Sequence, residues 1–226
     1  MGKTIAFIPV RGGSKSIPLK NIKIINGKPL VFWTVLAAHN CPGIDEIYVA
    51  TDSREIADTV NGFSFERVKV IGRSPDSATD TASTESAMLE FADNHDFDDI
   101  ILIQATSPLL TSGDLARGLK EYAREDVDSV LSVVRQKRFI WSSDGRHVKP
   151  CNYDIFARPR RQEFDGFLVE NGAFYITSKE LLLKSGCRIS GRIAAVEMSE
   201  ETYFEIDEPS DWIIVEELMK HKGLQQ

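Results

Sequence analysis

The chain has 226 residues, of which 42% are hydrophobic, so it is long enough to form one large α/β domain with a buried core. Its net charge of −7 argues against a nucleic-acid groove as the main activity, because phosphate backbones are bound by a surplus of lysine and arginine. Three cysteines without CxxC spacing indicate neither a disulfide framework nor a zinc site. The sequence starts without an apolar leader and contains no run of ~18 apolar residues, so we expect a cytoplasmic protein that does not enter membranes.

The first predicted strand, residues 4–9, runs directly into a loop that is rich in glycine and cations. Gly12 and Gly13 lack a Cβ atom, so the backbone can come close to an anion. Three cations follow in the same loop: Arg11, Lys15 and Lys20. A guanidinium binds phosphate oxygens in pairs while ammonium groups act as point charges, so the loop predicts a triphosphate site, although an exposed basic turn is the alternative. It is neither GxxxxGK[ST] nor GxGxxG, which excludes both common nucleotide loops.

Strand and helix patterns then alternate, which is typical of a mostly parallel sheet with helices on both faces. The other predicted strands are residues 46–51, 67–71, 99–104 and 128–134. The predicted helices are residues 29–40, 54–60, 84–95, 112–124 and 210–221. Ligands of such sheets bind beyond the carboxyl ends of the strands, so we expect Arg11, Asp52 and Gln104 at one edge.

Several polar residues at these strand ends have a structural alternative, because serine, threonine and aspartate are good helix N-caps. Asp52 and Ser53 precede a predicted helix, and we assign them no chemistry. Ser83 or Thr84 caps the next one, although a nucleotide contact by Ser83 is compatible with capping. Ser210 is the expected N-cap of the last helix, whose apolar stripe predicts core packing.

The composition changes sharply at residues 135–165, which are rich in arginine, lysine, aromatic residues and turn formers. We interpret this segment as an insertion that projects from a single domain covering residues 1–226. Its cations Arg158, Arg160 and Arg161 form either an anion site or a solvated basic face.

Two acidic residues close to the last helix are candidates for a metal site. Glu205 and Asp207 are separated by one residue, so on a strand both side chains would point to the same face. Mg²⁺ prefers carboxylate, water and phosphate oxygens. Asp211, in the first turn of the helix, is explained by the helix dipole. The four histidines do not cluster with a nucleophile, which gives a triad-type hydrolase no support.

Six segments in this order resemble the acylneuraminate cytidylyltransferases, the enzymes that make CMP-sialic acid and related CMP-nonulosonic acids. They are residues 9–21, ATDS at 50–53, DTAST at 80–84, QATSPL at 104–109, RRQ to ENGAFY at 160–175, and EIDEPSDW at 205–212. The resemblance covers nearly the whole chain. It implies a Rossmann-like nucleotidyltransferase fold, in which the insertion is a dimerisation element that helps to roof the active site of a partner subunit. A homodimer with shared active sites is therefore expected.

The resemblance implies CTP as co-substrate and Mg²⁺ as cofactor. The expected triphosphate contacts are Arg11, Ser14, Lys15 and Lys20. The alternative for Ser14 is that its hydroxyl only interacts with water on the loop surface. The expected contacts to ribose and cytosine are Asn21, Arg73 and Ser83. Asp207 is the expected metal ligand, and Glu205 is the second candidate although the family usually has aspartate there. Catalysis is assigned to Arg11, Lys15, Lys20 and Asp207, because the transition state needs its growing phosphate charge compensated.

The acceptor implied by the resemblance is a 2-keto sugar acid, whose carboxylate suits a planar cation. The expected acceptor contacts are Gln104, Arg161, Gln162, Asn171 and Tyr175. The implied reaction transfers CMP from CTP to the anomeric hydroxyl of a nine-carbon acid, namely sialic acid, its deaminated analogue KDN or a related nonulosonic acid, and releases pyrophosphate. The general base stays unassigned.

Two alternatives remain open. A cytidylyltransferase for the eight-carbon acid KDO usually carries an Arg-Leu-Pro-Gly-Lys run, whereas this chain has Ser-Ile-Pro-Leu-Lys-Asn at 16–21, which favours the nine-carbon acids. The alternative from another class is a noncatalytic nucleotide- or sugar-binding protein, for which Glu205 in place of aspartate is the motivating change.

Overall fold

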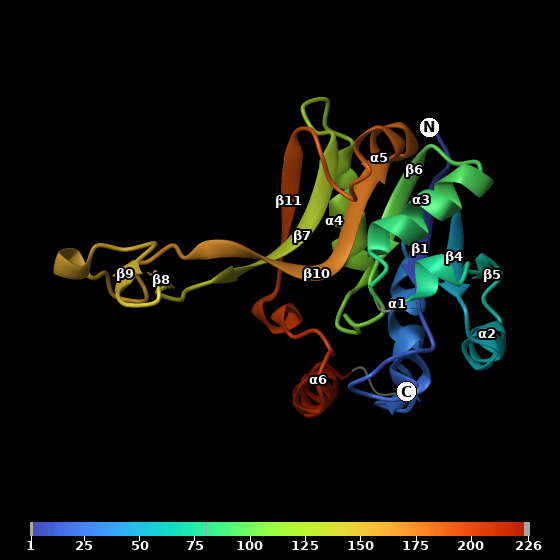
Figure 1. Ribbon diagram of the computed structural model, residues 1–226, viewed down its shortest axis with the longest axis horizontal. Coiled ribbons are helices and arrows are strands. Elements are labelled where there is room, and N and C mark those ends of the chain that lie inside the picture. The colour runs from blue at the N-terminus through green and yellow to red at the C-terminus, as the bar shows by residue number, and fades with distance from the viewer. Residues whose placement is uncertain (1, 80, 224–226) are drawn as a thin grey trace.

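The computed structural model describes residues 2–79 and 81–223. Within these residues a seven-stranded sheet has the order β11-β7-β10-β6-β1-β4-β5 (Figure 1). Its strands are β1 (Thr4–Pro9), β4 (Glu46–Thr51), β5 (Val68–Gly72), β6 (Asp99–Ile103), β7 (Ser129–Gln136), β10 (Phe167–Ser178) and β11 (Ile193–Met198). The helices are α1 (Leu30–His39), α2 (Arg54–Asn61), α3 (Thr84–Asn94), α4 (Ser112–Tyr122), α5 (Lys179–Ser185) and α6 (Pro209–His221). Among the described residues, none of these helices is long and apolar enough to cross a membrane.

The sheet is mostly parallel, as expected. β1 pairs in parallel with β4 and β6, β4 with β5, and β7 with β11. β10 is the exception, because it lies antiparallel between β6 and β7. Every strand and helix predicted from the sequence is present, with bounds that differ by at most two residues.

Strands β10 and β11 and helix α5 were not predicted, and in β10 the pair Asn171-Gly172 has the composition of a turn. The structure accommodates this pair as a β-bulge, with a register shift between Glu170 and Tyr175. Gly172 has a φ of +67°, which explains the glycine. The bulge lets one strand run from the sheet into the projecting arm described below.

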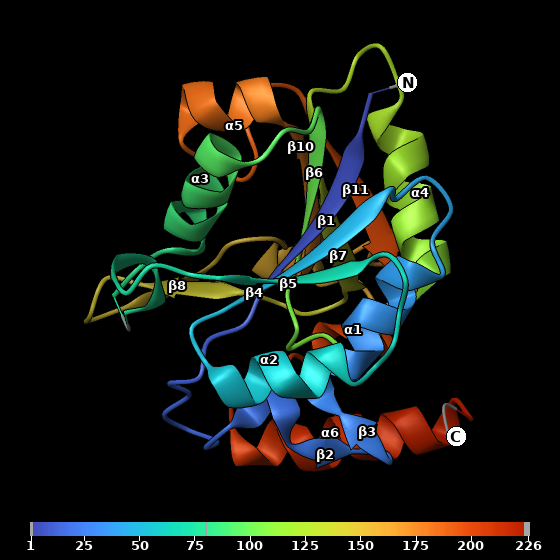
Figure 2. The same cartoon turned by 90° about the vertical axis from the view of Figure 1, so that its right-hand side faces the viewer.

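Hydrophobic residues of β1 alternate between two cores, because successive side chains of a strand point to opposite faces. Ala6 and Ile8 belong to the cluster that includes residues of α1, α2 and α4. Ile5 and Phe7 belong to the cluster with α3 and α5. Figure 2 shows these helix groups on the two sides of the sheet. The central strand is thus covered on both faces, which leaves its carboxyl end as the place for polar side chains.

Helix α6 packs its apolar stripe against the N-terminal region, as predicted. Trp212, Val215 and Met219 share a core cluster with Ile17 and residues of α1. The predicted N-cap Ser210 is wrong: the cap is Glu208, and Pro209 is the first helical residue. Proline at that position has its φ already set for a helix, so the helix begins earlier than the serine would place it.

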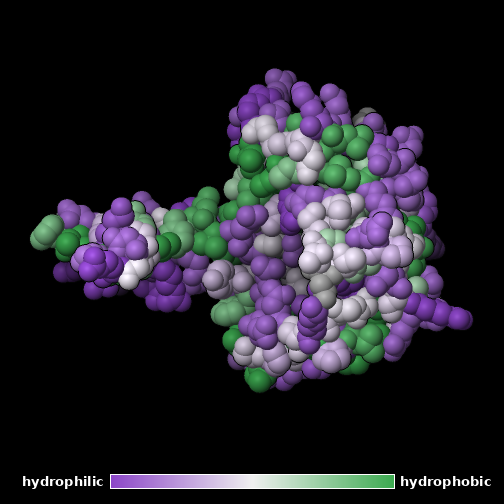
Figure 3. All heavy atoms as spheres, viewed as in Figure 1, coloured by the Kyte–Doolittle hydropathy of each residue, from purple (hydrophilic) through white to green (hydrophobic). Residues whose placement is uncertain are grey.

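The segment between β7 and β10, residues 137–166, projects from the sheet as an arm (Figure 1). It contains a two-stranded ribbon of β8 (Trp141–Ser143) and β9 (Val148–Pro150). A 3₁₀ turn, η3 (Ile155–Ala157), forms the gold coil at its far end. Hydrophobic and hydrophilic residues are interspersed over its surface (Figure 3). A second small ribbon, β2 (Ile24–Ile25) with β3 (Lys28–Pro29), precedes α1.

Candidate functional site

A cleft of about 370 Å³ lies at the carboxyl ends of β1 and β6. Its lining consists of Pro9, Arg11, Ser14, Lys20, Asn21, Arg73, Thr79, Ala82, Ser83, Thr84, Gln104, Ala105, Thr106 and Asp207. Eight predicted site residues are in this set: Arg11, Ser14, Lys20, Asn21, Arg73, Ser83, Gln104 and Asp207. Residues from five separate segments of the sequence are therefore brought together at the edge that the strand pattern indicated.

The loop after β1 is held by contacts to its own backbone and to β4. The amide of Asn21 donates to the carbonyl oxygen of Arg11 over 3.1 Å. The backbone N–H of Gly12 donates to Asp52 Oδ1 over 2.9 Å. A Cβ atom on Gly12 would lie 2.9 Å from Cβ of Ser53, whereas one on Gly13 would meet nothing within 4 Å. The close approach of the loop to the start of α2 therefore requires the glycine at position 12.

The same contacts explain the ATDS motif. Ser53 is the N-cap of α2, and its hydroxyl accepts a hydrogen bond from the backbone N–H of Ile56. Asp52 is not the cap; its carboxylate anchors Gly12. Asp52 thus anchors the loop after β1, a role that the neighbouring residues in the sequence do not indicate.

A second set of contacts joins the N-terminal loop to the segment before α6. The ammonium group of Lys20 donates to the carbonyl oxygen of Ile206 over 2.7 Å and to Asp207 Oδ1 over 3.1 Å. The hydroxyl of Ser16 donates to the carbonyl oxygen of Asp207 over 2.5 Å. Leu19, with a φ of 51°, makes the tight bend that turns Lys20 toward these oxygens. One wall of the cleft is therefore built from both ends of the chain.

The opposite wall carries Arg73 and the start of α3. The guanidinium of Arg73 donates to the carbonyl oxygen of Ser77, and that of Arg11 donates to Thr79 O over 3.2 Å. Burial lowers the pKa of Arg73, although the charge of Asp52 acts in the opposite direction. Ser83 caps α3 by accepting from the backbone N–H of Ser86 over 3.1 Å, as predicted, and it also lines the cleft. Asp80, in the same motif, lies outside the described residues.

Some predicted site residues lie away from this cleft. Lys15 is in the loop but is not one of the lining residues. Arg161 and Gln162 are on the arm, where Arg161 lines a separate cavity. Tyr175 is buried, and its hydroxyl donates to Glu170 Oε1 over 2.8 Å. In this conformation the acceptor contacts expected from the motifs are not assembled in one place.

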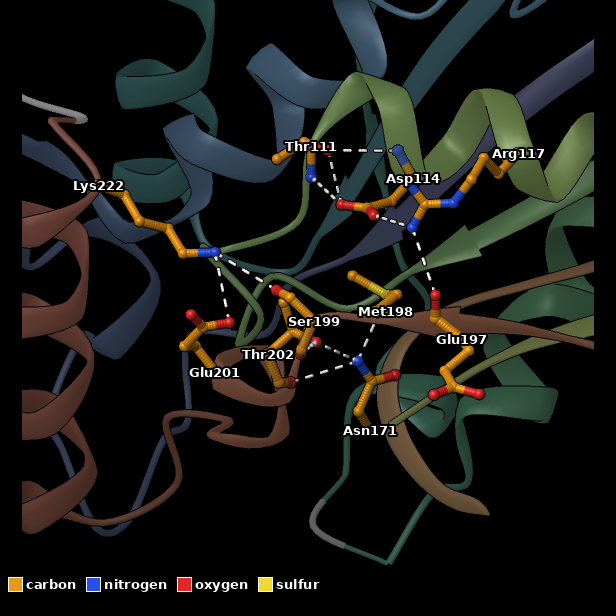
Figure 4. Close-up of polar contacts among 10 residues, drawn as sticks. All are labelled: Thr111, Asp114, Arg117, Asn171, Glu197, Met198, Ser199, Glu201, Thr202 and Lys222. Carbon is orange, nitrogen blue, oxygen red and sulfur yellow. Dashed lines mark hydrogen bonds and ion pairs between the residues drawn. The ribbon is translucent and has the colours of Figure 1, made fainter. Parts of the chain in front are cut away.

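Asn171 is also buried, with a side chain 1% exposed. Its amide donates to Thr202 Oγ1 over 3.0 Å and approaches the sulfur of Met198 at 3.4 Å (Figure 4). Thr202 belongs to the 3₁₀ turn η4 (Glu200–Tyr203). This amide therefore connects the bulge of β10 to the segment that leads into Asp207, and it does so from the interior.

The two carboxylates of the predicted metal site differ in their surroundings. The expectation that they share a face of a strand is wrong, since residues 204–207 form no strand in the structure. The carboxylate of Glu205 is half-buried against Gly172, where a Cβ atom would lie 2.6 Å from Glu205 Oε2. Burial, with a contribution from the charge of Asp207, raises the pKa of Glu205 to about 7. The side chain of Asp207 is 70% exposed and lines the cleft.

These surroundings can be tested against the needs of Mg²⁺. The described residues contain no cluster of three or more potential metal-ligating side chains. Mg²⁺ in nucleotide sites is often held by one or two carboxylates together with phosphate oxygens and water. Asp207 fits that arrangement because it is exposed in the cleft. Glu205 fits less well, since it is half-buried and is not one of the lining residues of the cleft.

The comparison with known families places the chain as a whole. The cytidylyltransferase family model matches residues 5–208. This chain belongs to the cytidylyltransferase family. The match confirms the family resemblance of the motifs, and residues of these motifs line both walls of the cleft.

Individual relatives agree with the family assignment. N-acylneuraminate cytidylyltransferase A of Danio rerio is 38% identical over 223 residues, which is 96% of this chain and 51% of that protein. N-acylneuraminate cytidylyltransferase of Oncorhynchus mykiss is 39% identical over 223 residues, 96% of this chain and 50% of that protein. The cytidylyltransferase chain thus spans about half the length of these curated relatives.

Solved structures agree on the fold. The CMP:2-keto-3-deoxy-manno-octonic acid synthetase complexed with CTP superimposes with a TM-score of 0.73 and 19% identity, covering 97% of this chain and 99% of that chain. At this identity the likeness concerns the fold alone, and it confirms the predicted Rossmann-like nucleotidyltransferase class.

Sequence reasoning missed part of the lining: Thr79, Ala82, Thr84, Ala105 and Thr106. All five belong to, or border, motifs from which only one residue each had been chosen. Thr106 contributes through its backbone, because its carbonyl oxygen accepts from the N–H of Ile206 over 2.9 Å. Backbone contacts of this kind leave no residue-type signal in a sequence.

Proposed function

We propose that the chain is a Mg²⁺-dependent cytidylyltransferase that transfers CMP from CTP to the anomeric hydroxyl of a nine-carbon 2-keto sugar acid and releases pyrophosphate. The observation that carries this proposal is a single cleft in which the cations Arg11, Lys20 and Arg73 face one exposed carboxylate, Asp207. Two relatives named N-acylneuraminate cytidylyltransferase support sialic acid and its analogues as acceptors.

The triphosphate would lie along the loop after β1. Arg11, Lys20 and the hydroxyl of Ser14 are placed to bind its oxygens, and Lys15 belongs to the same loop. Charge grows on the departing pyrophosphate during the reaction, and fixed cations stabilise that charge. Lys20 is held in place by Ile206, so it needs little reorganisation when the nucleotide binds.

The nucleoside would occupy the other end of the cleft. Asn21 would contact the ribose, and Arg73 and Ser83 would contact cytosine; all three line the cleft. Cytosine offers an amino donor and a carbonyl acceptor, so a pocket that selects it combines a donor such as Arg73 with backbone acceptors. Gln104, which follows β6 and lines the cleft, would contact the acceptor.

Asp207 would hold Mg²⁺ together with phosphate oxygens, and the ion would supply positive charge to the triphosphate. The anomeric hydroxyl would attack the α-phosphorus in line, forming the new P–O bond as the bond to pyrophosphate breaks. No covalent enzyme intermediate is required, and the general base is unassigned.

We further propose a homodimer in which the arm completes the partner's site. The arm, residues 137–166, has seven lysine and arginine residues against four acidic ones, whereas the rest of the chain has 20 against 30. Its cavity of about 680 Å³ is lined by Lys137, Arg138, Phe139, Trp141, Tyr153, Arg158, Pro159, Arg160 and Arg161. A positive arm complements a negative body. Arg161 would then bind the acceptor carboxylate of the partner's site, with Gln162 beside it.

The test is pyrophosphate release from CTP and Mg²⁺ against N-acetylneuraminic acid, its deaminated analogue, diamino nonulosonic acids and the eight-carbon acid KDO. A preference for one nine-carbon acid in kcat/KM would support the proposal and name the substrate. A preference for KDO would assign the chain to the alternative reaction. Tight CTP binding without turnover of any acceptor would favour a noncatalytic binding protein. A cytoplasmic location stays a prediction.

A further inference from the structure

One short loop, residues 74–79, holds two cations of the cleft through its backbone carbonyl oxygens. The guanidinium of Arg73 donates to Ser77 O, and that of Arg11 donates to Thr79 O over 3.2 Å. The Nε atom of Arg73 is buried and has no hydrogen-bond partner among the described residues. The contact with Ser77 therefore contributes strongly to the orientation of this guanidinium, and the position of the loop determines where it points.

The loop is in turn anchored to α3 by Glu90. The two carboxylate oxygens of Glu90 accept from the backbone N–H and the hydroxyl of Ser74, each over 2.9 Å. The hydroxyl of Ser74 accepts from the N–H of Ser77 over 3.2 Å, and the hydroxyl of Ser77 donates back to Ser74 O over 3.2 Å. A continuous chain of hydrogen bonds thus runs from Glu90 through two serines to Arg73.

Glu90 itself is not in the cleft lining. Burial alone would raise the pKa of Glu90, but the hydrogen bonds from Ser74 and the charge of Arg73 together hold it below its ordinary value. The carboxylate is therefore ionised at neutral pH, and hydrogen bonds to an ionised acceptor are stronger than neutral ones.

We propose that Glu90 is a positioning residue for nucleotide recognition, which fixes residues 74–79 and through them the guanidinium groups of Arg73 and Arg11. This role rests on the proposed function, since it concerns the binding of CTP. The proposed role predicts different effects on the two substrates. Loss of Glu90 weakens CTP binding and base selectivity, while the acceptor end of the cleft at Gln104 is unchanged.

A second cavity makes this role testable by chemical rescue. Glu90 also lines a space of about 240 Å³ between α3 and β5, together with Arg73, Phe91, Asn94 and His95. Removing the side chain in Glu90→Ala would enlarge this space next to Ser74. Formate can then enter and accept from the N–H and hydroxyl of Ser74, as the native carboxylate does.

The experiment measures CTP and UTP binding by calorimetry for the parent chain, Glu90→Ala, Glu90→Gln and the control Asp93→Ala, which changes an exposed acidic residue on the same helix. We expect Glu90→Ala to bind CTP about tenfold more weakly or worse, because hydrogen bonds to a charged group are lost. Its preference for CTP over UTP should fall, its KM for the acceptor should stay unchanged, and formate should restore part of the CTP affinity. Glu90→Gln should be intermediate, since its amide oxygen still accepts from the N–H of Ser74. Asp93→Ala should match the parent.

The outcomes separate this inference from the proposed function. A parent chain that bound no CTP would overturn the proposed function itself. A parent that bound CTP while folded Glu90→Ala bound it equally well would overturn only the role of Glu90. The role is equally overturned if CTP affinity and acceptor KM deteriorate together without rescue by formate, because that pattern indicates general loosening. Should Glu90→Ala fail to fold, Glu90→Gln takes its place in the test. Unchanged CTP affinity and base selectivity in that variant would overturn the role of Glu90.

Discussion

The ammonium group of Lys20 lies 3.1 Å from Oδ1 of Asp207, across 187 residues of sequence. The two partners differ in exposure: the side chain of Lys20 is 11% exposed and that of Asp207 is 70% exposed. Lys20 is fixed by its second contact, to the carbonyl oxygen of Ile206, whereas Asp207 keeps its outer face open to the cleft. The lysine thus connects the loop after β1 to the proposed metal ligand.

Replacing Lys20 should therefore affect both elements. We expect Lys20→Met to lower kcat/KM for CTP by about two orders of magnitude or more, because one fixed cation on the leaving group is lost. The Mg²⁺ concentration needed for half-maximal rate should change as well, since Asp207 loses its neighbouring charge. Steady-state kinetics at several Mg²⁺ concentrations measure both effects. Lys184→Met, which alters an exposed lysine on α5, is the control, and equal rates for the two variants would contradict the assignment.

The two loop glycines should respond differently to alanine. A Cβ atom at position 12 would lie 2.9 Å from Cβ of Ser53, while one at position 13 meets nothing within 4 Å. We expect Gly12→Ala to cost about 1–3 kcal/mol of unfolding free energy, because backbone must shift to relieve the contact. Gly13→Ala should unfold like the parent. Urea unfolding of both variants measures these free energies of unfolding. A larger loss of stability for Gly13→Ala than for Gly12→Ala would show that the loop is packed differently.

Glu205 predicts a pH dependence of stability. Its pKa is raised from 4.5 to about 7 in the folded protein, so the unfolded chain releases this proton first as the pH rises. The contribution of Glu205 to stability is complete below about pH 4.5 and is lost between that pH and about 7. We expect Glu205→Gln to be more stable than the parent at pH 8, by about 1–3 kcal/mol after allowance for solvent screening.

Thermal unfolding of Glu205→Gln without divalent cations measures this difference. The gain in Tm should be small at pH 4.5 and should grow up to about pH 8. Glu163→Gln, on the exposed arm, should show no such trend. A gain of the same size at both ends of the range would mean that burial does not control the protonation of Glu205.

The shared site can be tested by mixing inactive chains. Arg161→Ala removes the arm cation and Asp207→Ala removes the proposed metal ligand, so each proposed homodimer should be nearly inactive. After dissociation and reassociation of a 1:1 mixture, about a quarter of the parent activity should return, because half of the dimers contain one intact site of two. A mixture as inactive as its components would argue that Arg161 acts within its own chain, and an active Arg161→Ala homodimer would argue that it has no role.

Local pattern predicted most of the fold. β1 and β4 have the predicted bounds, because continuous apolar runs such as Ile5–Ile8 fit a strand covered on both faces. β10 was not predicted, because its bulge at Gly172 interrupts the alternation of a strand. The residue that packs against this bulge, Glu205, lies far away in the sequence.

The candidate site was predictable in composition but not in geometry. Residues in the loop after β1 and at the end of β6 were placed correctly by the rule that ligands bind at the carboxyl ends of strands. Asn171 and Tyr175 are polar residues in a conspicuous motif, yet both are buried and hydrogen-bonded inside the protein. The sequence does not distinguish a polar side chain that faces a ligand from one that satisfies another buried group.

The arm leaves the sheet between two strands that are already paired, with Gln136 opposite Phe167. Its two ends are therefore fixed side by side by the backbone ladder of β7 and β10, whatever lies between them. The entropic cost of closing such a connection grows only slowly with its length. The arm is thus suited to exchange as a unit: a segment taken from a related enzyme could be joined at these two positions to alter the proposed roof of the partner's site while the cleft at the carboxyl ends of β1 and β6 is kept.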